Sequence, residues 1–200
     1  MQLCMIAWLL GIIFGVILGY YSARFKVAVG IPVKMLSNGI SAVPVIVFLF
    51  WLHYPFQYML NISIDPFITS ALTLTIINLW GISTLVRTAI VELPEQYIIA
   101  AKTLGIPNKI IFKKIQFPLI FRQIIPTLII LEVNILHTSL FSSFISVPDL
   151  FRQVQNITSI AQKPIEIYTG LGLFFLLICL PLNWLASYLK NKYTRNISER

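Results

Sequence analysis

One acidic residue, Glu132, lies inside an otherwise apolar stretch of the chain, residues 121–142, which carries one further charge, Arg122, at its start. Near the centre of a membrane helix a charged side chain costs about 2.5–3.5 kcal/mol, so such residues usually face a polar partner or a solute path. Two interpretations follow. Either Glu132 lines a cavity through which a solute passes, or it pairs with a neighbouring helix or carries a proton and touches no solute.

Other polar side chains recur at helical spacing in this stretch and in an earlier one. Residues three or four positions apart share a face of a helix, as the lining of a polar path requires. The candidates are Asn134, His137 and Thr138 in the later stretch and Trp80, Thr84 and Arg87 in the earlier one. The guanidinium fork of Arg87 matches a substrate carboxylate, but a long side chain near a helix end also reaches the membrane surface. A lone histidine is more often structural.

The sequence contains none of the motifs that carry hydrolytic chemistry. It has no G-x-x-x-x-G-K-[ST] phosphate loop, no H-E-x-x-H and no nucleophile elbow. Cys4 and Cys179 stand alone in apolar stretches without metal-ligand spacing, which predicts structural thiols. We therefore predict no catalytic residue, no metal and no cofactor. If the protein pumps a solute, another subunit hydrolyses the ATP.

Five stretches of the chain are long and apolar enough to cross a membrane. The 200 residues are 58% hydrophobic and 11% charged, with mean hydropathy +0.85, and a membrane helix needs roughly 20 apolar residues. The stretches are residues 3–21, about 40–60, 66–86, about 121–142 and 167–189. The sequence therefore predicts an all-α integral membrane protein of one domain, residues 1–200, with about five transmembrane helices.

The basic residues predict the orientation of these helices. Thirteen of the fifteen lie at 24–34, 87–122 and 190–200, and two, Arg152 and Lys163, lie between the last two stretches. Because basic residues concentrate on the cytoplasmic side, the N-terminus is predicted outside and the C-terminus inside. The first stretch lacks a preceding basic segment, so we interpret it as a retained helix and not as a secretory signal. This distribution also argues against nucleic-acid binding.

Two segments between the apolar stretches are predicted to be structured. Residues 92–118 form a cytoplasmic loop with one helix over 93–104, stopped by Gly105, and a second from Pro107 that Pro118 closes. The Lys-bearing second helix either lies on anionic lipid or docks a cytoplasmic partner. The outer loop, residues 143–166, is predicted to contain a short amphipathic helix.

A stripe of glycines is predicted to form a packing seam in the first apolar stretch. Gly11, Gly15 and Gly19 recur every four residues, so they share a face and allow another helix backbone to approach closely. The sequence leaves open whether the other helix belongs to the same subunit or to a second one.

Residues 100–105 (AAKTLG), followed after nine positions by residues 115–118 (IQFP), resemble the cytoplasmic signature of ABC importer permeases. The usual form is Glu-Ala-Ala, three residues, Gly, nine residues, then Ile, any residue, Leu and Pro. Ile99 stands where the family usually has Glu, which leaves the strength of coupling open, and Phe117 stands where it has Leu. The resemblance implies that the contact with the ATPase involves Ala100, Ala101, Gly105, Ile115 and Pro118.

Residues from about 36 to 190 resemble the polar amino-acid branch of this family (histidine, glutamine or arginine type). The counterparts of its conserved runs are residues 41–44 (SAVP), 138–140 (TSL) and 147–150 (VPDL). Thr84 and His137 stand where acidic residues are common in the branch, so we expect a substrate without strong cationic character. Family members usually have a further stretch ahead of the first helix, and we expect the N-terminus of this chain to be shortened.

The resemblance implies a type I ABC importer permease core in the bacterial cytoplasmic (inner) membrane. The expected partners are ABC ATP-binding subunits, a second permease subunit in a homo- or heterodimer, and an extracytoplasmic solute-binding protein. The alternative is a degenerate or scaffold subunit that pairs with an active paralogous permease. A secondary transporter is disfavoured because the chain shows no inverted repeat, and a membrane enzyme is disfavoured because it lacks an acid, base and nucleophile set.

Overall fold

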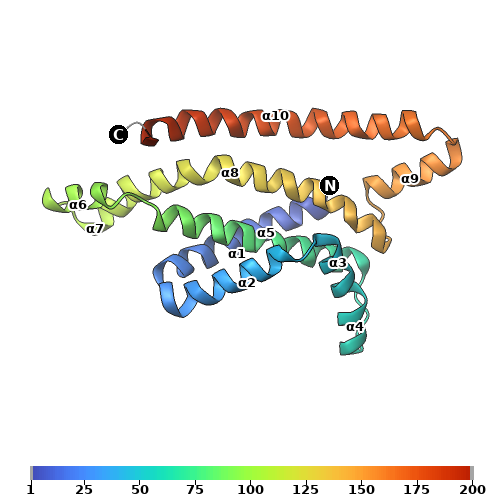
Figure 1. The fold of residues 1–200 in the computed structure, drawn as a ribbon, viewed down its shortest axis with the longest axis horizontal. Helices are drawn as coiled ribbons and strands as arrows, with labels where there is room; N and C mark the ends of the chain where they lie inside the picture. Colours follow the sequence, from blue (N-terminus) through green and yellow to red (C-terminus); the bar gives the residue numbers. More distant parts are fainter. Residues whose placement is uncertain (1, 199–200) are drawn as a thin grey trace.

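The protein is helical throughout the part that the computed structural model describes, residues 2–198, as predicted. Long helices run side by side in an elongated bundle (Figure 1). One end of the bundle, which we name the α6 end, carries α6 (Glu95–Thr103) and α7 (Asn108–Ile111). The opposite end, the α9 end, carries α9 (Leu150–Ala161). The last basic residue of the chain, Arg200, lies outside the described residues.

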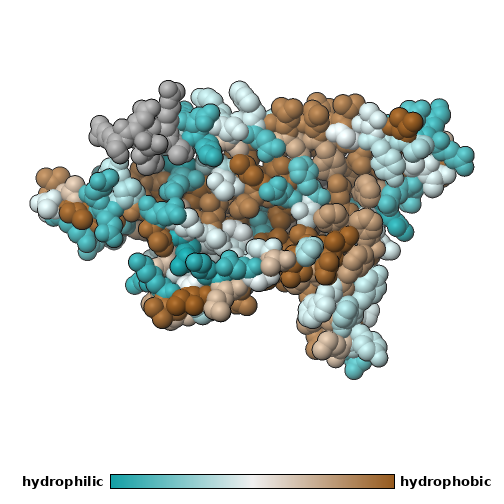
Figure 2. All heavy atoms as spheres, viewed as in Figure 1, coloured by the Kyte–Doolittle hydropathy of each residue, from teal (hydrophilic) through white to brown (hydrophobic). Residues whose placement is uncertain are grey.

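Within the described residues, four helices are long and apolar enough to cross a membrane unaided. The candidate spans are Gln2–Arg24, Pro66–Val91, Asn108–Ile145 and Pro164–Tyr193. They correspond to α1 (Gln2–Arg24), α5 (Pro66–Val91), α8 (Phe117–Thr138) with its flanking turns, and α10 (Pro164–Ser198). Each contains one predicted stretch. Apolar side chains cover much of α10, whereas polar ones gather toward both ends of the bundle (Figure 2).

The fifth candidate span is a bent pair, which differs from the single span expected over residues 40–60. A π-helical turn, η1 (Lys26–Gly30), leads into α2 (Ile31–Ala42). After a break come α3 (Val45–His53) and α4 (Pro55–Leu60), and the two halves meet at 96°. The cause is Pro44. Its ring disfavours helical geometry at the preceding residue, and Val43 is accordingly extended, with φ −89° and ψ 127°.

The glycine seam packs α1 against α5 of the same chain, which answers the question that the sequence left open. A Cβ on Gly15 would lie 2.8 Å from the Cβ of Ile82, and one on Gly19 would lie 2.7 Å from the carbonyl oxygen of Ser83. Real Cβ atoms do not approach so closely, so only glycine fits these positions. The absence of side chains brings the two backbones together.

Both predicted helices of the 92–118 segment are present, but Pro118 does not close the second. That helix continues from α7 through a π-helical turn, η2 (Phe112–Gln116), into α8. Pro118 falls in the first turn of α8, where the missing N–H is tolerated. Just before it, the Phe117 N–H donates to the carbonyl of Phe112, five residues back. The prediction of a helix end at Pro118 is therefore wrong.

The outer segment contains the predicted short amphipathic helix. A 3-10 helix, η3 (Ser139–Ile145), follows α8, and α9 comes next, before the chain turns into α10. The Asp149 carboxylate caps α9 by accepting a hydrogen bond from the Arg152 N–H at 2.8 Å. Val154 is the buried residue of α9, and Ile160, about 120° around the helix from it, is 84% exposed.

The seam predicts that replacing a glycine inside it destabilises the protein much more than replacing a glycine elsewhere. Gly19→Ala should lower the free energy of unfolding by about 1–3 kcal/mol, because the added methyl group forces α1 away from α5. Gly172→Ala on α10 is the matched control, since a Cβ there meets nothing within 4 Å. It should be neutral or slightly stabilising. Thermal unfolding of both variants in detergent tests this, and equal melting temperatures would contradict the seam.

Candidate functional site

Glu132 lies at a junction of three helices, α1, α5 and α8. The Asn78 side chain of α5 donates from Nδ2 to both carboxylate oxygens at 3.1 Å and to the Ala7 carbonyl of α1 at 3.2 Å. The Trp8 Nε1–H of α1 donates to the Glu132 carbonyl at 3.1 Å. Asn78 is only 2% exposed. These four residues, which we name the polar junction, tie the three helices together inside the bundle.

The contacts of Glu132 are those of an interhelical pair, which was the second of the two interpretations. Glu132 and Asn134 are two residues apart, about 200° around the helix, so they point to nearly opposite sides of α8. A role for Glu132 in a substrate path stays a prediction. Sequence reasoning missed Asn78, although it is the one amide side chain in residues 66–91. Only the register of α5 against α8 shows that it meets Glu132.

The other predicted path residues of α8 share a more exposed face. Asn134 and His137 are exposed and Thr138 is half-buried. The Thr138 hydroxyl donates to the Asn134 carbonyl at 2.7 Å, and the His137 ring lies 6.0 Å from the ring of Phe175 on α10. The structure therefore brings these three together on one side of the helix, as their spacing predicts.

The predicted path residues of α5 lie farther toward the α6 end. The Thr84 hydroxyl is 2.8 Å from the Ser37 hydroxyl of α2, and Trp80 is half-buried. Arg87 is also half-buried, and its Nε lies 3.5 Å from the place that a Cβ on Gly30 would take. Arg87 thus packs against the η1 turn. That position favours the structural interpretation of Arg87, and its contact with a substrate stays a prediction.

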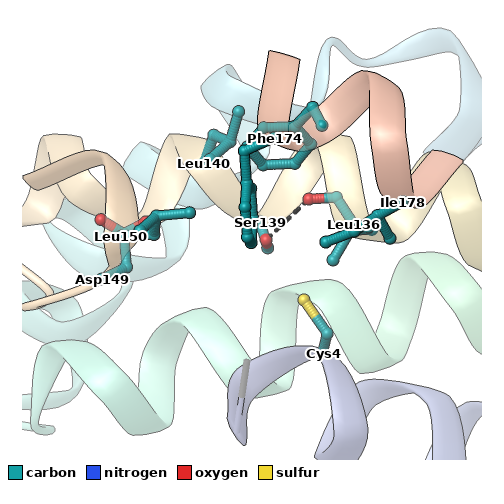
Figure 3. A pocket seen from close by; sticks show the side chains of 9 residues that line it. Cys4, Leu136, Ser139, Leu140, Asp149, Leu150, Phe174 and Ile178 are labelled. Atoms are coloured by element: carbon teal, nitrogen blue, oxygen red, sulfur yellow. Dashed lines mark hydrogen bonds between the residues drawn. The ribbon is translucent and has the colours of Figure 1, made fainter. Parts of the chain in front are cut away.

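A small cavity of about 30 Å³ lies between α1, α8, α10 and the start of α9 (Figure 3). The Cys4 thiol points toward it, and Ser139 and Asp149 lie along its wall. Burial raises the pKa of the Asp149 carboxyl above its usual value of 3.8, and the backbone N–H groups that it caps oppose this shift only in part. Cys4 and Cys179 are both buried, as expected of structural thiols.

The predicted coupling residues lie at the α6 end of the bundle, in α6 and the turn after it and where η2 joins α8. Ala100 is exposed and Ala101 is buried. Gly105 has φ +71°, and its N–H bonds to the Lys102 carbonyl while the Ile106 N–H bonds to the Ala101 carbonyl. This pair of bonds ends a helix with a left-handed residue, which explains the glycine. The other two predicted residues, Ile115 and Pro118, are half-buried where η2 joins α8.

Residues 11–195 match the family model described as binding-protein-dependent transport system inner membrane component. The chain belongs to this family. Two similar proteins are the L-cystine transport system permease protein TcyB of Bacillus subtilis and the glutamine transport system permease protein GlnP of Escherichia coli. The first is 24% identical over 96% of this chain and 83% of its own length. The second is 26% identical over 76% of this chain and 70% of its own length.

Two solved structures have the fold of this permease. A crystal structure of an amino acid ABC transporter with histidines matches with TM-score 0.77 and 21% identity, over 96% of this chain and 90% of that one. An inward-facing structure of the MetNI methionine ABC transporter matches with TM-score 0.71 and 16% identity, over 94% of this chain and 91% of that one. The predicted permease fold is thereby confirmed.

The polar junction predicts energetic coupling between Asn78 and Glu132 of the permease. Asn78→Ala should destabilise the fold by about 1–3 kcal/mol because it leaves a half-buried carboxylate without its donor. In a double-mutant cycle with Glu132→Ala, the coupling energy should be about 0.6–1.7 kcal/mol, as for polar pairs between membrane helices. Thr73→Val is the matched control. Thr73 is buried on α5, and its hydroxyl bonds only to the Thr69 carbonyl. Additive effects in the cycle would contradict the pairing.

Asp149 predicts a pH dependence of stability. Because its pKa is raised in the folded state, protonation favours folding. This stabilisation of the fold is complete when the pH is below 3.8, the usual pKa of the carboxyl. It is lost as the pH rises through the raised pKa of the folded state. Asp149→Asn keeps an acceptor for the cap without the charge, so the variant should melt above the wild type at pH 7, with no gap below pH 3.8.

Asp65→Asn provides the control for this pH dependence. Asp65 caps α5 through the Phe67 N–H at the same 2.8 Å but is exposed. Melting curves of both variants across this pH range make the comparison. An equal gain from Asp65→Asn, or a gain from Asp149→Asn that persists below pH 3.8, would show that burial of the Asp149 carboxyl is not the cause.

Proposed function

We propose that this chain is the permease subunit of an ATP-binding cassette importer and forms part of the translocation path for a polar amino acid. The family description names a binding-protein-dependent transport component of the inner membrane. Two relatives are named for amino acids, glutamine and cystine. These names, with the fold, support a bacterial inner-membrane importer in which the ATP is hydrolysed by a separate subunit.

The observation that carries this proposal is the exposed helical turn at the α6 end. α6 projects beyond the bundle, next to the start of α8 (Figure 1). Ile99 of α6 is 57% exposed, and Leu104, which follows the helix, is 79% exposed. A short helix with an exposed apolar face is suited to a groove on a partner protein. An ATP-binding subunit that takes this helix would act on α8 through the turn at residues 104–107, because α7, η2 and α8 beyond it are continuous.

A second permease subunit is the expected cover for the exposed polar face of α8. Asn134 and His137 lie on a helix that crosses the membrane, and polar groups facing lipid are costly there. A second copy or a paralogue facing this side would enclose Asn134, His137 and Thr138 in a shared path. The family description supports a solute-binding protein on the opposite side from the ATPase. This arrangement requires the α6 end in the cytoplasm.

The proposed substrate is a polar amino acid without strong cationic character. Thr84 bonds to Ser37 and His137 is exposed, so neither position supplies the carboxylate that a cationic side chain would need. Glutamine and cystine, the substrates that name two relatives, carry no net positive charge at neutral pH. Selective uptake of arginine or lysine would contradict this part of the proposal.

One observation favours the alternative of a scaffold subunit. Ile99 is exposed on α6 at the position where the family signature usually has Glu. If that carboxylate is needed for coupling, this chain would position an active paralogous permease without transmitting force itself.

Gly105 provides the test of coupling. Gly105→Val places a branched side chain at φ +71°, which costs about 1–2 kcal/mol and should reduce recovery of the ATP-binding subunit roughly 5- to 30-fold. Gly105→Asn is the matched control, since Asn tolerates this conformation and the space around Gly105 is open. The measurement is affinity purification of the tagged permease from its native membrane, with mass spectrometry of what co-purifies and amino-acid uptake by the same cells.

The outcomes separate the two functions. Loss of the ATPase and of uptake with Gly105→Val, but not with Gly105→Asn, supports the importer. If the folded wild type recovers only another permease and no ATPase, the scaffold function is correct.

A further inference from the structure

The segment Val45–Leu60, which consists of α3 and α4 and which we name the outer arm, leaves the bundle at the α9 end (Figure 1). α2 runs along the bundle beside α5, whereas the outer arm is bent from η1 and α2 by 96°. If the long helices cross the membrane, α2 runs in the same direction as they do. The outer arm then runs close to the plane of the membrane surface.

The α4 part of the outer arm buries a polar residue and exposes the residues that follow it. Gln57 is the buried residue of α4, at 7% exposure. On the same short helix Tyr58 is 84% and Met59 73% exposed. On α3, Trp51 is 47% exposed although Leu49 is buried. A helix on a water-facing surface has the reverse pattern, so the outer side of the arm is suited to apolar surroundings.

Gln57 anchors α4 through hydrogen bonds and not through apolar packing. Its Nε2 donates to the Thr69 hydroxyl of α5 at 3.0 Å, and its Oε1 accepts from the Ile64 N–H at 2.8 Å. His53 lies beside it, with Nδ1 3.3 Å from Gln57 Nε2. These contacts satisfy the polar groups on the inner side of α4, while Tyr58 and Met59 on the same helix are exposed.

Composition identifies what covers that outward side. The outer arm carries no Asp, Glu, Lys or Arg, and seven of its sixteen residues are Phe, Trp, Tyr or His, namely Phe48, Phe50, Trp51, His53, Tyr54, Phe56 and Tyr58. Tyr and Trp concentrate where the hydrocarbon of a bilayer meets its headgroups. A surface for a water-soluble protein would instead carry a polar, often charged rim. The uncharged aromatic arm fits the lipid interface.

We propose that the outer arm lies along the membrane surface, embedded in the lipid headgroup region at the α9 end, and that it does not cross the bilayer. Its partner is the lipid bilayer itself. The Gln57 contacts hold the arm to the start of α5, so the arm fixes the depth of that helix end. Residues 45–60 of the predicted span over residues 40–60 then lie along the surface.

Depth measurements along the outer arm test this proposal. Single cysteines replace Val47, Trp51 and Tyr58, which are all exposed, and carry a nitroxide label. The native Cys4 and Cys179 are buried and stay as an unlabelled background. The whole complex that purifies with the permease is placed in liposomes. Collision of each label with oxygen and with a water-soluble nickel chelate then gives its depth.

α10 supplies the matched control. Leu173 and Trp184 are exposed and eleven residues apart, the same separation as Val47 and Tyr58. On a crossing helix this corresponds to about 16 Å of depth. We expect α10 to show a gradient close to that value, and the outer arm to differ by less than about 5 Å, near the headgroup level.

Three results would overturn the proposal. A gradient along the arm like that of α10 would show that it crosses the membrane. Labels reached by neither reagent would show that a protein, such as a second permease copy, covers the arm. Labels reached only by the nickel chelate would show that the arm stands in water, where a solute-binding protein has access. The proposal is supported if the labels on the arm lie at nearly the same depth and each collides with both oxygen and the nickel chelate.

Discussion

The close approach of α1 and α5 determines where the other helices of the bundle lie. Three glycines of α1 meet Asn78, Ile82 and Val86 of α5 within the distance that a Cβ would occupy. Between membrane helices such contact depends on backbone packing, because lipid offers no hydrophobic driving force for association. With the backbones this near, the Asn78 amide reaches the Ala7 carbonyl across the seam.

The polar junction follows from this approach and sets the rotation of α8. Once Asn78 is held against α1, its Nδ2 is directed at Glu132, and Trp8 holds the backbone of α8 at the same level. Turning α8 away would leave the Glu132 carboxylate without its donor in an apolar surrounding, which is unfavourable. The face that carries Asn134 and His137 is thereby fixed on the far side of α8. The acidic residue thus orients the proposed path, whether or not it lines it.

Local signals in the sequence were enough to predict most of the helices but not their contacts. Apolar runs of about twenty residues locate the long helices, and Gly105 marks the helix end that the structure shows. Pro44 carried the signal for the break in the second stretch, since the residue before a proline avoids helical geometry. Pro118 is chemically the same residue yet does not end the helix, because the π-helical turn before it leads directly into α8. The partner of Glu132 depends on the register between α5 and α8, which no local pattern contains.

The two ends of the bundle end their helices in different ways. At the α6 end the left-handed residue is Gly105, which adopts φ +71° without steric cost. The three left-handed residues of the outer segments are Asn61, Ser146 and Gln162, all with side chains. For Ser146 and Gln162 this conformation costs roughly 1–2 kcal/mol each, so the surrounding packing must hold it in place. Ser146 lies between Ile145 and Val147, each 2% exposed in the core that joins α1, α3, α5 and α8. The left-handed turn at Ser146 is thus held in place by the packing of its two neighbours in this core.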